Sequence, residues 1–141
     1  MIEVIDNQRK IKLERRLFQK FAEKAAVEIS ETENKSLTIA FVSDRKMRRL
    51  NDEFRGVNAT TDVLSFPFEA DEFEIDAEHL GDIVISIEQA SKQAAENDLS
   101  LETEIKQLIL HGVLHLCGYD HETDNGDMNR REMELREILG I

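Results

Sequence analysis

Three of the four histidines of the chain lie within eleven residues, in the segment HGVLHLCGYDH at positions 111–121. His111 and His115 are four residues apart, so on a helix they lie on the same face. Gly118 follows, and a glycine there allows a sharp turn that would bring His121 back toward the pair. Three protein ligands with one open position are typical of a catalytic zinc site rather than a structural one. The spacing therefore predicts that these three histidines hold a metal ion.

The types of ligand favour Zn²⁺ among the common ions, although imidazole also binds Ni, Co and Fe. Two roles fit Asp120, which precedes His121: its carboxylate either orients an imidazole ligand or caps the turn. Cys117 lies two residues beyond His115, on another face of the helix, and we expect it to pack as a small buried hydrophobe. The structural alternative is that the histidines are core residues or caps. The remaining histidine, His79, lies in an acidic stretch and is expected to be solvated.

The same histidine spacing occurs in a group of zinc metalloproteases, whose pattern is H-E-x-x-H-x-x-G-x-x-H. In those enzymes the glutamate is the general base. This chain has Gly112 at that position, so the metal-binding pattern lacks the residue that would activate water for peptide hydrolysis. A glycine inside a helix costs about 1 kcal/mol relative to alanine, which indicates either close packing or open space beside the metal.

The histidines need a helix to position them, and the preceding residues predict one over 101–117. Ser100 can cap its start, acidic residues occupy its first turn, and Gly118 ends it. From residue 108 onward this helix is apolar nearly all round, so we expect it to be buried.

Alternating and four-residue apolar patterns predict the other elements. We predict strands over 1–6, 36–42, 62–68 and 80–86, and helices over 11–29, 44–53, 87–97 and 127–140. Ser43 can cap the second helix, Ser86 and Gln89 form a capping box for the third, and Pro67 ends its strand or places it at an edge. The order βαβαββααα predicts an α+β fold: a four-stranded mixed sheet packed with about five helices, with a zincin-like helix for the metal site.

Length and composition set the class of protein. A chain of 141 residues with 40% hydrophobic residues predicts a single domain over residues 1–141. The N-terminal segment lacks the apolar core of a signal peptide, and no apolar run approaches the ~20 residues of a membrane span. A single cysteine cannot form an intramolecular disulfide, which fits a reducing compartment. We therefore expect a soluble cytoplasmic protein.

The net charge of −12 opposes binding to nucleic acid, but the charge is uneven. Residues 1–58 contain 13 Lys and Arg against 10 Asp and Glu, whereas residues 59–141 contain 5 against 20. A basic surface formed by residues 1–58 could bind RNA. Charge alone favours the simpler interpretation, in which these residues form solvated helix faces.

The segment HGVLHLCGYDH, together with NDEFRGVNATTDVLSFPFE (51–69) and LGDIVIS (80–86), resembles the YbeY family of bacterial endoribonucleases of ribosomal RNA maturation. The resemblance extends over nearly the whole chain, and the three motifs occur in the family's order. In the second motif, Arg55 and the run TDVLSF (61–66) fit the family pattern, whereas residues 57–60 vary.

The resemblance implies a metal-dependent, single-strand-specific endoribonuclease. Its role would be 3′-end maturation of small-subunit (16S) rRNA, ribosome assembly and ribosome quality control. It implies that His111, His115 and His121 hold one metal ion, usually zinc, and that Arg55 is functionally important. Guanidinium geometry suggests the hypothesis that Arg55 clamps the phosphate. Its partners would be ribosomal RNA and the small ribosomal subunit or its assembly factors, with no membrane or DNA partner.

An RNA substrate would also explain the missing glutamate. RNA carries its own nucleophile, the 2′-hydroxyl, next to each phosphodiester bond, so cleavage through it needs no glutamate-activated water. Attack by water activated at the metal is the alternative route. The products separate the two routes, because only the first leaves a 2′,3′-cyclic phosphate.

Other interpretations remain open at the level of sequence. Arg55 ends the charged stretch RKMRRLNDEFR, and taken alone it would be a solvated surface residue. Lys46, Arg48 and Arg49 likewise form either an RNA-facing patch or a solvated face. The protein as a whole could be a non-catalytic ribosome assembly factor with a structural metal, or another zinc hydrolase or peptidase. The absent glutamate weighs against the peptidase.

Overall fold

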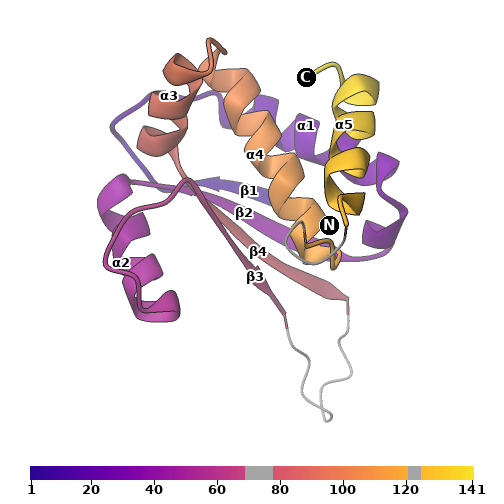
Figure 1. Ribbon diagram of the computed structural model, residues 1–141, viewed down its shortest axis with the longest axis horizontal. Helices are drawn as coiled ribbons and strands as arrows, with labels where there is room; N and C mark the ends of the chain where they lie inside the picture. The colour runs from indigo at the N-terminus through magenta and orange to yellow at the C-terminus, as the bar shows by residue number, and fades with distance from the viewer. Residues whose placement is uncertain (69–77, 121–124) are drawn as a thin grey trace.

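The computed structural model describes residues 1–68, 78–120 and 125–141, and it confirms the predicted α+β fold (Figure 1). Its elements are β1 (Ile2–Asp6), α1 (Arg15–Glu28), a 3-10 turn η1 (Ser30–Thr32), β2 (Ser36–Val42), α2 (Asp44–Arg55), β3 (Val63–Pro67), β4 (His79–Ser86), α3 (Ile87–Glu96), α4 (Leu101–Leu116) and α5 (Asp127–Leu139). Within these residues there are four strands and five α-helices, in the order that the apolar patterns predict. No helix in this part of the chain is both long and apolar enough to cross a membrane.

The four strands form one mixed sheet in the order β1-β2-β4-β3. β2 pairs in parallel with β1 and β4, whereas β3 pairs with β4 in antiparallel fashion. β1 and β3 are therefore the edges, and Pro67 lies on an edge strand, where it removes no ladder hydrogen bond. Side chains of α1 meet the backbone of β1: the Gln19 amide accepts from Val4 N (2.8 Å) and donates to Ile2 O (2.6 Å).

The two faces of the sheet are covered by different helices. Ile83 and Ile85 of β4 belong to the main core, which includes residues of α1, α4 and α5. Val84, between them, belongs to a smaller cluster with Leu64 of β3 and Met47 of α2. Successive strand residues point to opposite faces, so α4 and α2 pack on opposite sides of the sheet.

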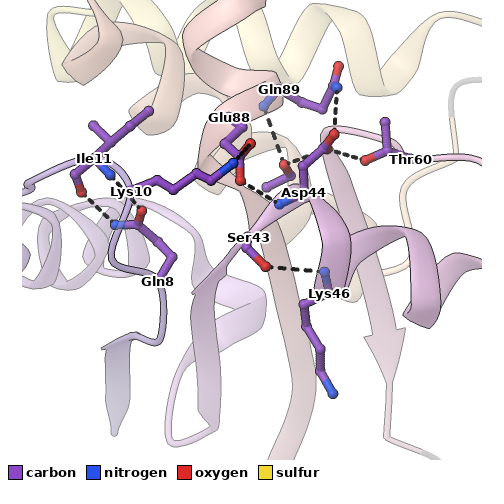
Figure 2. Close-up of polar contacts among 10 residues, drawn as sticks. Gln8, Lys10, Ile11, Ser43, Asp44, Lys46, Thr60, Glu88 and Gln89 are labelled. Atoms are coloured by element: carbon purple, nitrogen blue, oxygen red, sulfur yellow. Dashed lines mark hydrogen bonds and ion pairs between the residues drawn. The ribbon is translucent and has the colours of Figure 1, made fainter.

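Serine hydroxyls cap three helices, as predicted. Ser43 accepts from Lys46 N (3.2 Å), Ser86 accepts from Gln89 N (3.3 Å) and Ser100 accepts from Thr103 N (3.1 Å). The reciprocal half of the predicted capping box is different, because the Gln89 amide donates to Asp44 Oδ2 (3.3 Å) and so ties α3 to α2 (Figure 2).

The first helix is shorter than predicted, beginning at Arg15 rather than at residue 11. The Gln8 side chain explains the difference, because it accepts from Ile11 N (3.0 Å) and donates to Ile11 O (2.7 Å) (Figure 2). These bonds hold the backbone in a local loop that competes with the helix. Ile11 and Leu13 still pack against the core, which is why the apolar pattern extends beyond the helix.

The prediction for His79 was wrong. It is the first residue of β4 and is only partly exposed. Its Nδ1 lies 3.0 Å from Ser36 Oγ on β2, and its Nε2 lies 3.2 Å from Asp82. Of the acidic stretch that suggested a solvated position, residues 69–79, the part 69–77 lies outside the described residues.

Candidate functional site

A cleft of about 610 Å³ brings together two motifs that are far apart in the sequence. Phe54 and Arg55 line it from the end of α2, and His111 and His115 line it from α4. Between them lie Asp62 and the whole of β3. Because α2 and α4 cover opposite faces of the sheet, the cleft crosses the outer edge of β3.

The two histidines of α4 converge on one point. His111 Nε2 and His115 Nε2 are 3.2 Å apart, and the two rings are inclined at 78°. A tetrahedral zinc ion at its usual distance of about 2.0–2.1 Å would hold two imidazole nitrogens about 3.3 Å apart. The separation is therefore compatible with two ligands of one metal ion.

A carboxylate on α5 fixes the orientation of the first histidine. Glu132 Oε1 lies 2.7 Å from His111 Nδ1, and Glu132 is only 7% exposed. An ionised carboxylate only accepts hydrogen bonds, so the proton lies on Nδ1 and a neutral ring presents the lone pair of Nε2 toward His115. Arg136 in turn donates to Glu132 Oε2 (2.8 Å).

The charge on Glu132 is stabilised by these two partners. Burial alone would raise the pKa of the Glu132 carboxyl. The hydrogen bond with His111, the positive charge that this ring carries when protonated, and the charge and hydrogen bond of Arg136 outweigh burial and lower the pKa. The carboxylate is therefore held ionised behind His111.

The role of Glu132 is not evident from the histidine spacing, but the sequence of α5 contains a signal for it. The buried residues of α5 are Met128, Glu132, Leu135 and Leu139. Their helical spacing defines an apolar face, and Glu132 is the one acidic residue among them. Because a buried carboxylate needs a partner, its position on this face indicates that a polar side chain lies opposite it in the core. That side chain is His111.

The third predicted ligand, His121, lies outside the described residues. Asp120, beside it, is described, but its role at the site stays a prediction. Among residues 1–68, 78–120 and 125–141, no three His, Cys, Asp or Glu side chains are grouped to hold a metal ion. These residues alone therefore supply a pair of ligands, His111 and His115.

Arg55 is exposed at the last position of α2. Gly56 follows in the left-handed conformation (φ 68°), a common way to end a helix. Within the described part of the chain, no hydrogen bond or ion pair engages the Arg55 guanidinium. Its planar donors can therefore bind an anionic group in the cleft.

Close packing explains why the chain has glycine, not glutamate, at position 112. A Cβ atom at this position would lie 2.8 Å from Ile83 Cγ2, a distance that real Cβ atoms do not show. Glycine thus allows α4 to approach β4 closely, on the side of the helix that faces the sheet. Of the two explanations offered by the sequence, close packing is correct.

Cys117 is partly buried and packs against the main core, as expected for a small hydrophobe. Burial raises the pKa of its thiol to about 11. It is not among the described residues that line the cleft.

Comparison with known proteins gives consistent matches along the chain. A family model described as Endoribonuclease YbeY matches residues 2–140. Endoribonuclease YbeY of Clostridioides difficile is 45% identical over 105 residues, which cover 72% of this chain and 69% of that protein. The protein of the same name from Helicobacter pylori is 40% identical over 137 residues, or 97% of this chain and 91% of the relative. A solution structure from Thermotoga maritima matches with a TM-score of 0.68 at 28% identity, covering 99% of this chain and 90% of the other.

Proposed function

Since the chain belongs to the YbeY family of endoribonucleases, we propose that its cleft cleaves single-stranded RNA with the help of a divalent metal ion. The observation that carries this proposal is the composition of the cleft. An exposed guanidinium, Arg55, and a pair of converging imidazoles, His111 and His115, line it along the same edge strand. Such a combination of an anion clamp and a Lewis-acid position can stabilise the charge that develops in phosphodiester cleavage.

The metal would be bound by His111 and His115, with His121 as the third ligand, and Zn²⁺ suits these ligands best. When bound, it would supply a positive charge beside a phosphoryl or leaving oxygen. Arg55 would bind the phosphate with two parallel hydrogen bonds and hold it over the edge of β3. Glu132 would keep His111 in the tautomer whose Nε2 faces the ligand position.

The substrate itself would supply the nucleophile. Gly112 provides no general base at its position on α4, and its close approach to Ile83 leaves no room for one there. Attack by the ribose 2′-hydroxyl needs no base at that position, which makes RNA a better substrate than peptide. In this step the 2′-oxygen would bond to phosphorus, the bond from phosphorus to the 5′-oxygen of the next nucleotide would break, and the 2′-hydroxyl proton would be lost to solvent while the leaving oxygen gains one. Mass spectrometry of the products tests this step: a 2′,3′-cyclic phosphate and a 5′-hydroxyl are expected, and a 5′-phosphate with a 3′-hydroxyl would contradict it.

A cleavage assay with purified protein tests the activity. The unmodified protein should cut a single-stranded RNA oligonucleotide when loaded with Zn²⁺ and should lose activity in a chelator. Arg55→Ala and His115→Ala should each reduce cleavage by at least about 100-fold, the loss typical for a group that stabilises developing charge. Arg16→Ala, which removes an exposed arginine from α1, should leave cleavage unchanged. Full activity of Arg55→Ala would contradict the clamp.

We also propose that the substrate in the cell is the 3′ end of small-subunit rRNA in the cytoplasm, bound to the small subunit or its assembly factors. Cells whose only copy carries His115→Ala should accumulate 3′-extended 16S precursor while the protein stays abundant and folded. Mature 3′ ends in such cells would refute this substrate. Precursor accumulation together with a folded protein that cuts no RNA in vitro would instead favour an assembly factor.

A further inference from the structure

Helix α2 concentrates positive charge on a molecule whose net charge is −12. Its twelve residues, DRKMRRLNDEFR, include five cations and three acids. All five cations are exposed: Arg45, Lys46, Arg48, Arg49 and Arg55. The last of them lines the cleft, so the basic surface of the helix continues directly into the candidate site.

The cations of α2 differ in their partners from those of α4 and α5. Elsewhere, Lys106 pairs with Glu102 and Arg136 with Glu132. Among the described residues, no ion pair involves a cation of α2. Arg48 has a neutral partner instead, Asn58, whose Oδ1 accepts from Arg48 Nε (3.0 Å).

Asp44, the acidic residue at the start of α2, forms hydrogen bonds with neutral side chains instead of pairing with a cation in the described part of the chain. Asp44 accepts from Ser86 Oγ (3.0 Å), from the Gln89 amide and from Thr60 Oγ1. Figure 2 shows Asp44 in this network, with the Lys46 side chain extending away from it. All five cations face solvent, and so do the other two acids of the helix, Asp52 and Glu53. The exposed part of α2 therefore keeps a net positive charge, which favours a polyanionic partner.

An exposed aromatic ring lies where this surface meets the cleft. Phe54 is 60% exposed although it is a large hydrophobic residue. Its ring contacts Phe66 of β3 edge to face, with centroids 5.3 Å apart, so one side of it is supported. Exposed aromatic rings beside cationic side chains are the usual stacking surfaces for unpaired bases.

We propose that α2 guides single-stranded RNA into the cleft, with a base stacked on Phe54 and the exposed cations of α2 in contact with the backbone leading away from Arg55. The inference rests on the proposed function, because it assigns the cleft to RNA. It adds the path of the strand and a reason for single-strand preference, since only an unpaired base exposes its face to a ring. The four cations beyond Arg55 contact phosphates outside the reaction centre.

Binding of a fluorescein-labelled single-stranded RNA, measured on a His115→Ala background to prevent cleavage, tests the stacking. Phe54→Ala should weaken binding about 10- to 100-fold. Phe54→Trp should bind at least as well as the parent, whereas Phe54→Leu, which keeps apolar bulk without a π face, should bind as poorly as alanine. Equal binding by the Leu and Trp variants would overturn the stacking role. Circular dichroism should show the same fold for all three.

The salt dependence of binding tests the cations. Replacing Lys46 and Arg49 by glutamine should lower the slope of log K against log salt by about 0.7 for each lost phosphate contact. The control replaces two exposed lysines of α1, Lys20 and Lys24, by glutamine and should leave the slope unchanged. Equal slopes for the two double variants would overturn the inference.

The outcomes separate this inference from the proposed function. If the unmodified protein cuts RNA but the α2 variants bind RNA normally, the strand path is wrong and the ribonuclease stands. If the α2 variants lose binding but the unmodified protein cuts nothing, α2 binds RNA and the catalytic proposal fails.

Discussion

The contact between His111 Nδ1 and Glu132 fixes the orientation of the ring that we propose as a metal ligand. We predict that Glu132→Ala weakens Zn²⁺ binding about 10- to 100-fold, because the ring of His111 loses the acceptor that fixes its tautomer. Competition with a chelator of known affinity measures this effect without any RNA. Glu132→Gln keeps an acceptor oxygen and should weaken binding less.

The matched control for this prediction is Glu137→Ala, which removes an exposed glutamate from the same helix. It should bind Zn²⁺ like the unmodified protein. Far-UV circular dichroism of the metal-free proteins shows whether α5 still folds. A folded Glu132→Ala protein with unchanged Zn²⁺ affinity would mean that the carboxylate only satisfies a buried imidazole.

Gly112 provides a second prediction for a single residue. Alanine has the higher helix propensity by about 1 kcal/mol, yet its Cβ would overlap Ile83, and overpacking of this kind costs about 1–3 kcal/mol. We predict that Gly112→Ala lowers the free energy of unfolding by up to about 2 kcal/mol, as measured with urea. In an Ile83→Ala background the same change should be neutral or stabilising, which the double-mutant cycle detects. Destabilisation of the same size in both backgrounds would exclude the contact with Ile83 as the cause.

Among the elements, the helix caps and most strands could be predicted because their signals are local. Ser43 and Ser100 act within three residues of their own positions. The start of α1 could not be predicted from its apolar pattern, because Ile11 packs on the core from a loop held by Gln8. The apolar periodicity indicates which residues are buried, and here partly buried residues continue before the start of α1.

The candidate site depends on contacts between elements, so only its parts could be predicted from the sequence. Arg55 and the histidines could be proposed separately, on a family motif and on spacing. Their meeting in one cleft follows from the position of β3 at the edge of the sheet, next to β4. The hydrogen bond between His111 and Glu132 likewise requires α5 to pack beside α4, and no local sequence pattern specifies this packing.

The packing of α3 against α4 predicts a dependence of stability on pH. Burial, and then the charge of Asp62, raise the pKa of Glu104, although Asn97 and Arg136 act in the opposite direction. The folded protein therefore holds the Glu104 proton more tightly than the unfolded chain does.

This group makes the protein less stable as pH rises from the ordinary glutamate pKa of 4.5 through the raised value in the fold. Relative to Glu104→Gln, the unmodified protein should lose free energy of unfolding as pH rises above the ordinary glutamate pKa of 4.5, as measured in urea. Glu96→Gln, an exposed change on α3, should follow the unmodified protein. Parallel pH profiles for the unmodified protein and Glu104→Gln would contradict the raised pKa.

At the scale of the whole molecule, the distribution of charge has a functional consequence under our proposals. Residues 59–141 carry 20 acidic and 5 basic side chains, so the part of the surface that these residues form repels RNA. The exposed cations of α2 then form the approach for a strand. Low affinity for RNA elsewhere on the surface would limit cleavage of unintended RNAs, and a ribosome-bound partner could supply the missing affinity.

The arrangement of the core leads to a prediction about the role of the proposed metal ion. The main core consists of residues from β1, β2, β4, α1, α3, α4 and α5. None of these buried core residues is among the residues that line the cleft. We therefore predict that the metal-free protein stays folded, in contrast to small domains that fold only with zinc. Free Zn²⁺ at about 100 times its Kd should add about 2.7 kcal/mol, or roughly 5–11 °C in Tm for a chain of this size.

Thermal unfolding followed by circular dichroism, with and without Zn²⁺, measures this shift. His115→Ala should unfold near the Tm of the metal-free protein and gain nothing from Zn²⁺, because it loses a ligand while the core stays intact. Lys92→Ala, an exposed change on α3, should keep the full shift. A metal-free protein without a cooperative transition would mean that the ion completes the fold, and the family's nuclease chemistry would then need a centre other than the histidine pair.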